Sequence, residues 1–281
     1  MNVIKKMSTL ILLSLALIAS GQEKPFEVEV KGQGEHLLLL PGFTCTGEVW
    51  DDLVTELSKT YTCHVFTFAG FGGVPPIAKP WLPRIKDGLI NYIAANKLDA
   101  PVVIGHSLGG TLGLWLGTEE QSSYKRIIVV DALPSAGALM IPNYKSENII
   151  YDSPYNKQLL EMNAEKFAAM ANQTASFMTL TTEKIPQLVD WIVHADRETY
   201  VYGYTDLLKL DLRETIGSIT TPVTILAATH PYGLETAKKN YTKQYKNLKS
   251  YDIAFAEGAA HFIMYDKKEW FLEQVKKALK N

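Results

Sequence analysis

The chain has 281 residues, of which 47% are hydrophobic and 21% are charged, and its formal net charge is −2. This apolar content suffices for a sizeable core, and the lack of a basic excess argues against nucleic acid as a partner. No metal-ligand spacing, dinucleotide fingerprint or phosphate-binding loop occurs, so we expect no metal and no cofactor. The composition indicates an ordinary globular protein and does not indicate its oligomeric state.

Residues 1–21 are predicted to be a secretory signal peptide. Lys5 and Lys6 form a short basic region, residues 10–19 form an apolar run, and residues 19–21 resemble a cleavage site. The run is about half the ~20 residues that a membrane span requires, so we expect no stable membrane insertion after cleavage. We therefore expect a mature protein that is exported to the periplasm or the exterior of the cell.

Strands alternate with helices over the next hundred residues. The predicted strands are residues 26–30, 36–40, 62–68, 102–104 and 127–130, and the predicted helices are residues 50–57, 81–96 and 111–119. Near-continuous apolar runs are typical of strands that are covered on both faces. The alternation predicts a mostly parallel sheet with helices on both faces and a ligand site at the carboxyl ends of the strands.

The alternation stops at residue 134, and only helices are predicted as far as residue 210. These helices are residues 155–173, 183–195 and 197–210, after which strands 222–226 and 251–255 and helices 234–245 and 268–279 restore the pattern. We predict a core domain of residues 22–133 and 211–281, with residues 134–210 inserted as a helical lid. Several apolar lid residues are candidates for a substrate pocket, although such residues often only hold helices together: Met140, Phe177, Met178 and Trp191.

The chain has two cysteines, Cys45 and Cys63, which we predict to be unpaired. Cys45 follows one predicted strand, whereas Cys63 begins the next. In parallel neighbours these positions lie at opposite ends, some ~15–20 Å apart. Bridged cysteines have Cα atoms within ~7 Å of each other.

The sequence Gly105-His106-Ser107-Leu108-Gly109 is the strongest functional signal, because it joins a predicted strand to a predicted helix. A G-x-S-x-G sequence in that context indicates a nucleophile elbow. A side chain at residue 105 or 109 would collide with neighbouring backbone in so sharp a turn. The turn would expose the Ser107 hydroxyl and direct the amide groups of the helix N-terminus at a nearby anion. The alternative is a structural serine in a tight turn.

A serine hydroxyl needs a base to remove its proton, and His261 is the predicted base. It follows the last predicted strand, in a loop whose small residues would allow a close approach to Ser107. His106, inside the elbow, is expected to pack inward. The alternative for His261 is a loop histidine without a role.

From about residue 26 to its end, the chain resembles serine hydrolases of the α/β-hydrolase fold that carry a helical cap. The resemblance rests on residues 40–43, 105–110 and 258–262, although the first loop begins Pro-Gly where this family usually has His-Gly. It implies a mostly parallel, doubly wound sheet with an all-helical lid inserted between two strands. It also implies an oxyanion hole formed by the backbone N–H groups of Phe43 and Leu108.

The family usually supplies the triad acid just after the strand that here ends at residue 226, but residues 227–233 contain no carboxylate. Asp131, at the end of the strand that follows the elbow helix, is the predicted replacement and keeps the order nucleophile, acid, base. Glu235 is nearer the usual place, but an acidic residue in the first turn of a helix is expected for dipole reasons alone. Asp131 as a simple strand-end cap, with no functional acid, is also open.

These features predict an exported serine esterase that cleaves a carboxylic ester of a small to medium apolar substrate through an acyl-enzyme on Ser107. A C–C bond hydrolase, a cofactor-free peroxidase or an amidase could use the same three residues on the same fold. The missing acid after residue 226 also leaves open a pseudo-hydrolase that binds a small ligand without turning it over.

Overall fold

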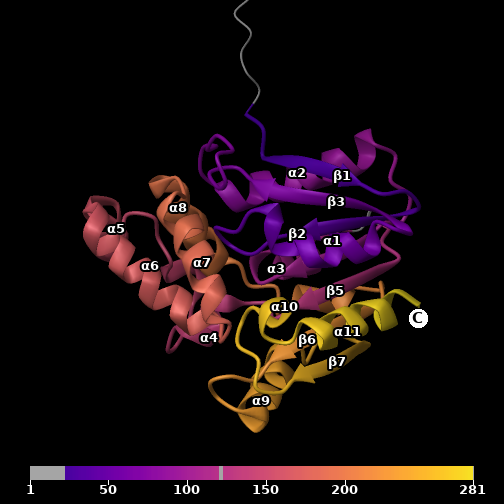
Figure 1. The fold of residues 1–281 in the computed structure, drawn as a ribbon. Helices are drawn as coiled ribbons and strands as arrows, with labels where there is room; N and C mark the ends of the chain where they lie inside the picture. The colour runs from indigo at the N-terminus through magenta and orange to yellow at the C-terminus, as the bar shows by residue number, and fades with distance from the viewer. Residues whose placement is uncertain (1–22, 120–122, 281) are drawn as a thin grey trace, which may run out of the picture.

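The computed structural model describes residues 23–119 and 123–280, so the predicted signal peptide lies outside the described residues. Within them, seven strands form one sheet in the order β1-β3-β2-β4-β5-β6-β7 (Figure 1). Only β1 runs antiparallel to its neighbour, β3. The strands are β1 (Phe26–Lys31), β2 (Glu35–Leu40), β3 (Tyr61–Phe68), β4 (Val102–His106), β5 (Arg126–Val130), β6 (Val223–Ala228) and β7 (Tyr251–Ala256). The predicted mostly parallel sheet is confirmed.

Helices cover both faces of this sheet, as the continuous apolar runs of the strands require. One face carries α2 (Trp81–Ala95), α3 (Leu108–Gly117) and α9 (Leu234–Gln244), and the other carries α1 (Asp51–Leu57) and α11 (Lys268–Lys280). Two short elements, η1 (Gly47–Trp50) and α10 (Ile263–Asp266), pack on the face of α1 and α11, and η4 (Thr215–Ser218) packs on the face of α2, α3 and α9.

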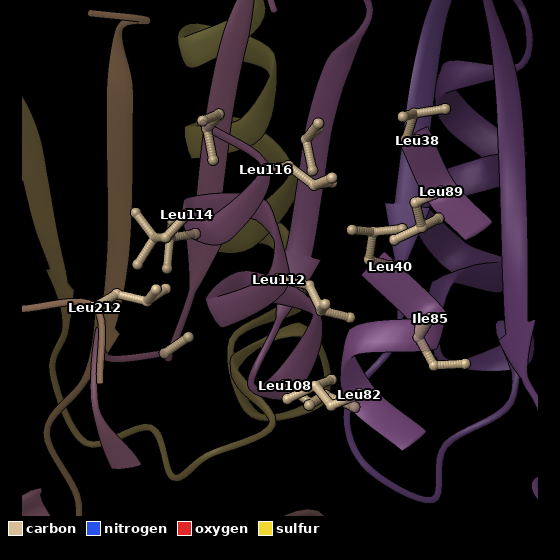
Figure 2. Packing of buried hydrophobic residues seen from close by; sticks show 14 of the residues in the cluster. Leu38, Leu40, Leu82, Ile85, Leu89, Leu108, Leu112, Leu114, Leu116 and Leu212 are labelled. Atoms are coloured by element: carbon tan, nitrogen blue, oxygen red, sulfur yellow. The ribbon is translucent and has the colours of Figure 1, made fainter. Parts of the chain in front are cut away.

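Strand β2 shows how the two apolar layers form. Its side chains alternate between the faces, as the two-residue period of a strand dictates. Leu38 and Leu40 point into the layer that contains α2 and α3, where Figure 2 shows them with Leu89 and Leu112. Leu37 and Leu39 belong to the opposite layer, and all four strand leucines are fully buried. The central strands are therefore fixed in position from both sides.

Between β5 and β6 the described chain contains only helices, which lie together beside the sheet (Figure 1). Apart from η4, which packs with the core, they are α4 (Ala136–Met140), η2 (Ser146–Asn148), α5 (Pro154–Glu161), α6 (Ala164–Met178), η3 (Thr182–Lys184), α7 (Ile185–Val193) and α8 (Arg197–Lys209). We call this segment the helical insertion. Buried Asp206 of α8 attaches it to the core, because its carboxylate accepts hydrogen bonds from the backbone of Trp81 at 2.7 Å and of Leu82 at 3.1 Å.

Two details of the helices differ from the sequence-based prediction. The single helix expected over residues 155–173 is two helices, because the Asn163 side chain accepts a hydrogen bond from Lys166 N at 2.9 Å and starts α6 anew. Asparagine is a strong N-cap, so it favours a boundary inside an otherwise periodic run. The short helices α4 and α10 were not predicted, since they are too brief to show a period.

Cys45 and Cys63 are both free and buried, which confirms that they are unpaired. Cys63 pairs with Leu37 near the start of β2, whereas Cys45 lies beyond the end of that strand. In the part of the chain that is described, none of the helices has both the length and the apolar content needed to cross a bilayer.

A partly buried chain of hydrogen-bonded side chains links β2, β3 and α2, away from the carboxyl ends of the strands. His64 Nε2 lies 2.9 Å from His36 Nδ1, and His64 Nδ1 lies 2.7 Å from the Tyr92 hydroxyl. Burial first, and then the neighbouring His36, lower the pKa of His64 to about 4. His64 is therefore neutral in the folded protein at neutral pH.

This shift predicts an acid-sensitive fold. A histidine in an unfolded chain has a pKa of about 6.5. Between roughly pH 6.5 and pH 4, residue 64 therefore binds a proton in the unfolded chain but not in the folded protein. Stability is complete above this window and falls as the pH falls through it. In urea unfolding across this range, the free energy of unfolding of wild type should fall by up to about 3 kcal/mol more than that of His64→Gln. Parallel curves for the two proteins would contradict this role of His64.

Candidate active site

The predicted site residues follow the carboxyl ends of three strands of the parallel part of the sheet. Ser107 follows β4 and Asp131 follows β5, while His261 lies in the loop after β7. Backbone hydrogen bonds fix the first two, from Ser107 N to Val130 O at 2.9 Å and from Asp131 N to Leu226 O at 2.8 Å. Because parallel strands end at the same edge, residues far apart in sequence converge there.

Ser107 has the strained backbone of a nucleophile elbow, with φ 52° and ψ −119°. Glycines on both sides make this turn possible. A Cβ at Gly105 would lie 2.1 Å from the Gly109 carbonyl oxygen, and a Cβ at Gly109 would lie 2.1 Å from the Leu40 carbonyl oxygen. The predicted backbone collisions at residues 105 and 109 are thus confirmed. Strain of this kind persists only where the surroundings over-determine it, and it clusters at functional sites.

The imidazole of His261 is hydrogen-bonded to the carboxylate of Asp131, with Nδ1 and Oδ2 2.6 Å apart. The other carboxylate oxygen, Oδ1, accepts two further hydrogen bonds, from Ala228 N at 2.8 Å and from the Tyr241 hydroxyl at 2.8 Å. Ala228 ends β6, the strand after which the acid was first sought. Asp131 therefore reaches across from β5 to that position, and the end of β6 supplies a donor to it.

Opposing effects set the charge of this carboxyl. Burial alone would raise the pKa of Asp131, but hydrogen bonds from His261, Ala228 and Tyr241 outweigh it and hold the pKa below its ordinary value. Tyr241 remains a neutral donor, because burial and then the Asp131 charge raise the pKa of its phenol well above the usual value. Asp131 is thus an anion that can keep the Nδ1 proton on His261.

Glu235, the alternative acid, lies elsewhere. Its side chain is 86% exposed on α9 and pairs with Lys238 at 3.0 Å. The structure therefore joins His261 to Asp131 and not to Glu235.

The two predicted oxyanion donors lie on segments that contact each other. Leu108 is the first residue of α3, where a backbone N–H has no acceptor within its own helix. Phe43 belongs to the loop after β2, and the clashes that a Cβ at Gly109 would make with Leu40 and Pro41 show how closely that loop approaches α3. The Phe43 ring contacts four aromatic rings from the core and the insertion: Phe71, Trp81, Tyr200 and Tyr204.

The four predicted pocket residues are not equivalent in the structure. Met140 and Phe177 are 57% and 67% exposed, so they lie on the surface of the insertion. Trp191 is only 6% exposed and packs in an apolar cluster against which Met178 also lies. The backbone oxygen of Met178 accepts a hydrogen bond from Phe262 N at 3.0 Å, next to His261. Trp191 thus packs as a core residue, while Met178 lies at the junction with the histidine loop.

Sequence reasoning did not find Tyr241, which donates to Asp131, or the contact between His106 and His261. Tyr241 is one of 14 tyrosines and lies 110 positions from Asp131. No local pattern distinguishes it, because its role depends on how α9 packs against the strand ends.

The model of the alpha/beta hydrolase family matches residues 37–274 of this chain. The chain belongs to the alpha/beta hydrolase family. The predicted family is confirmed, and with it the prediction of a serine hydrolase. The match includes the elbow, the loop after β2 and the histidine loop, so the family's characteristic segments all fall within it.

Individual relatives of this hydrolase are distant but similar over most of their length. A pimeloyl-[acyl-carrier protein] methyl ester esterase of Vibrio cholerae is 22% identical over 251 residues, covering 88% of this chain and 95% of the relative. The enzyme of that name from Shewanella oneidensis is 29% identical over 210 residues, covering 70% of this chain and 74% of the relative. An esterase structure from Exiguobacterium antarcticum superposes with a TM-score of 0.75 at 17% identity, covering 91% of this chain and 96% of its own.

The acid assignment predicts different outcomes for two conservative substitutions. If Asp131 holds the tautomer of His261, Asp131→Asn should lower kcat by about 10⁴, by analogy with known triads. Glu235→Gln should leave kcat unchanged. Steady-state hydrolysis of a p-nitrophenyl ester measures both, with circular dichroism as a folding control. An active Asp131→Asn beside an inactive Glu235→Gln would reverse the assignment.

Proposed function

We propose that this hydrolase is a serine esterase that cleaves a carboxylic ester of a small to medium apolar substrate, with Ser107, His261 and Asp131 as its triad. The observation that carries the proposal is the hydrogen bond between His261 Nδ1 and the Asp131 carboxylate. Both residues lie after strands of the sheet in which Ser107 forms a strained turn at the end of β4. Acid, base and nucleophile then occur on the expected edge of the sheet.

In the proposed reaction, Asp131 keeps the Nδ1 proton on His261, so that Nε2 is the basic nitrogen. Nε2 accepts the proton of the Ser107 hydroxyl as the oxygen attacks the ester carbonyl. The protonated imidazole then donates that proton to the departing alcohol and leaves an acyl group on Ser107. His261 next takes a proton from water as the water oxygen attacks the acyl-enzyme, and it gives that proton to Ser107 Oγ as the bond from Oγ to the acyl carbon breaks and the acid leaves.

The negative oxygen of each tetrahedral intermediate would accept hydrogen bonds from Leu108 N–H and Phe43 N–H. Each donor of this kind contributes roughly 3–4 kcal/mol of transition-state stabilisation. Both donors are backbone groups, so a proline at residue 41 in place of the family's usual histidine leaves them intact.

The substrate class rests on the insertion and on the relatives. Met178, an apolar residue of the insertion whose backbone bonds the histidine loop, supports an apolar acyl or alcohol group. The relatives are named as methyl ester esterases, which also favours an ester with a small alcohol. Their name gives a second candidate, an ester whose acyl group is carried on an acyl-carrier protein.

The alternatives on the same three residues have less support. No observation on this site favours a C–C bond hydrolase, a peroxidase or an amidase over an esterase. The relatives are named for ester hydrolysis. The pseudo-hydrolase rested on the missing acid after β6. That argument weakens because Asp131 reaches the end of β6 and bonds His261.

The esterase proposal predicts covalent labelling. A fluorophosphonate probe should modify wild type at Ser107, as found by mass spectrometry of the digested protein. Ser107→Ala should not be labelled and should lose ester hydrolysis. Labelling that persists in Ser107→Ala would refute the nucleophile, and an inert wild type would support the pseudo-hydrolase.

A substrate series separates the two candidate substrates. We expect p-nitrophenyl esters of short and medium chain to be hydrolysed with the highest kcat/KM, alongside free methyl esters. A preference for a methyl ester borne by an acyl-carrier protein, by more than about tenfold over the matching free methyl ester, would instead favour the relatives' substrate. Tenfold corresponds to about 1.4 kcal/mol of transition-state stabilisation, which a real carrier contact should exceed.

We also propose that the protein is exported and loses residues 1–21. The basic start, the apolar run and the small residues that follow it support this. Expression of the full chain followed by cell fractionation should yield a protein that begins at Gln22 in the periplasm or the medium. An intact N-terminus in the cytoplasmic fraction would contradict export.

A further inference from the structure

A single buried imidazole connects the three loops of the candidate site. His106, the last residue of β4, is fully buried, and its Nε2 lies 3.0 Å from the backbone oxygen of His261. A carbonyl oxygen only accepts hydrogen bonds, so His106 Nε2 carries a proton and donates it. The His106 ring also packs against the rings of His261 and Phe262, with centroids 4.6 Å and 4.7 Å away.

The other face of this imidazole meets the loop that contains Phe43. A Cβ at Gly42 would lie 2.8 Å from His106 Nδ1, so residue 42 approaches the ring as closely as a glycine allows. His106 Nδ1 is buried and has no hydrogen-bond partner among the described residues. The ring is therefore oriented by its single hydrogen bond to His261 and by packing.

This surrounding also fixes the charge of the ring. Burial first, and then the neighbouring His261, lower the pKa of His106 to about 3. A proton on Nδ1 would leave a buried charge without an acceptor, which is costly in an apolar environment. His106 consequently stays neutral and adds no positive charge beside His261 when the latter is protonated during a reaction.

We propose that His106 is a positioning residue for the triad, which holds the backbone of His261 so that its imidazole meets both Asp131 and Ser107. The inference rests on the proposed esterase function. The histidine loop contains Gly258, with φ 77°, followed by two alanines, so its own side chains give it little rigidity. Hydrogen bonds from outside the loop supply this rigidity, and the one from His106 acts at the residue that carries the imidazole.

A second anchor holds the preceding residue of the same short segment. The backbone N–H of Ala260 donates to Asp266 Oδ2 at 2.8 Å, while Asp266 Oδ1 accepts from Leu180 N at 2.9 Å and from the Thr179 hydroxyl at 2.6 Å. Asp266 thus ties the loop to the insertion, and His106 ties it to the elbow. Misplacement of a reacting group by about 1 Å can cost 10²-fold in rate, so the loss of one anchor should be measurable.

Two matched variants separate the hydrogen bond from simple packing. His106→Phe keeps an aromatic ring but removes the donor to the His261 carbonyl. His106→Gln keeps an N–H donor at similar reach but removes the ring. We expect His106→Phe to lower kcat for a p-nitrophenyl ester by 10–100-fold with KM changed less than about threefold, and His106→Gln to retain clearly more activity.

A spectroscopic readout tests positioning directly. The Nδ1 proton of His261, shared with Asp131, should give a downfield proton resonance in wild type. This resonance should shift or broaden in His106→Phe and persist in His106→Gln. Unchanged kcat and an unchanged resonance in His106→Phe would overturn the inference. Equal losses in the two variants would also overturn it, because packing alone would then explain them.

The inference remains testable if His106→Phe does not fold. Nitrogen-15 spectra of the wild-type imidazoles should then show His106 neutral and protonated at Nε2 down to about pH 4.5. Protonation of His106 near pH 6, or a proton on Nδ1 in the neutral form, would refute the donor role. If wild type reacts neither with esters nor with fluorophosphonate, the proposed esterase function is refuted. This result differs from the results that refute the role of His106 alone.

Discussion

The site depends on a mostly buried carboxylate at the end of β5. Burying a charge costs several kcal/mol unless hydrogen bonds replace the lost water. Asp131 receives such bonds from His261, from the backbone at the end of β6 and from Tyr241 on α9. These donors come from three separate parts of the chain. The carboxylate can therefore remain charged only when β6, α9 and the histidine loop are all in place around it.

The parallel sheet explains why such a carboxylate can stand on β5. Strands β5 and β6 are adjacent and end at one edge, so a side chain from one reaches the backbone of the other. The residue that follows β5 and the residue that follows β6 lie at the ends of neighbouring strands. An acid on either strand can meet the same imidazole, provided that the unused strand end offers an N–H and not a second carboxylate. Ala228 meets this condition.

Hydrogen bonds join the helical insertion to the histidine loop. The carbonyl of Met178 bonds Phe262 N, and residues after α6 bond Asp266, which also holds Ala260. The histidine loop is thus placed between the elbow and the insertion. In the proposed function, a group bound against the insertion would contact the same loop that carries the base.

The sequence predicted those parts of the molecule that depend on local pattern. The sharp turn at Ser107 was predicted because its glycines must lie where a strand meets a helix, and the strands were predicted because central strands need continuous apolar runs. Asp131 was proposed as the acid from its place at a strand end, although the sequence alone left Glu235 open, and the structure shows its hydrogen bond to His261. The tertiary partners could not be found in this way. No sequence spacing marks Tyr241 or the contact between His106 and His261. Trp191 was predicted as a candidate pocket residue, and only the structure shows that it packs in an apolar cluster.

The central claim is that Ser107, His261 and two backbone amides converge on one reacting centre. The most direct measurement is a crystal structure of the protein after reaction with an organophosphonate ester. The account predicts phosphorus bonded to Ser107 Oγ and a phosphonyl oxygen within about 3 Å of the N–H groups of both Leu108 and Phe43. A phosphonyl oxygen directed away from both amides, or an adduct on a different residue, would contradict it.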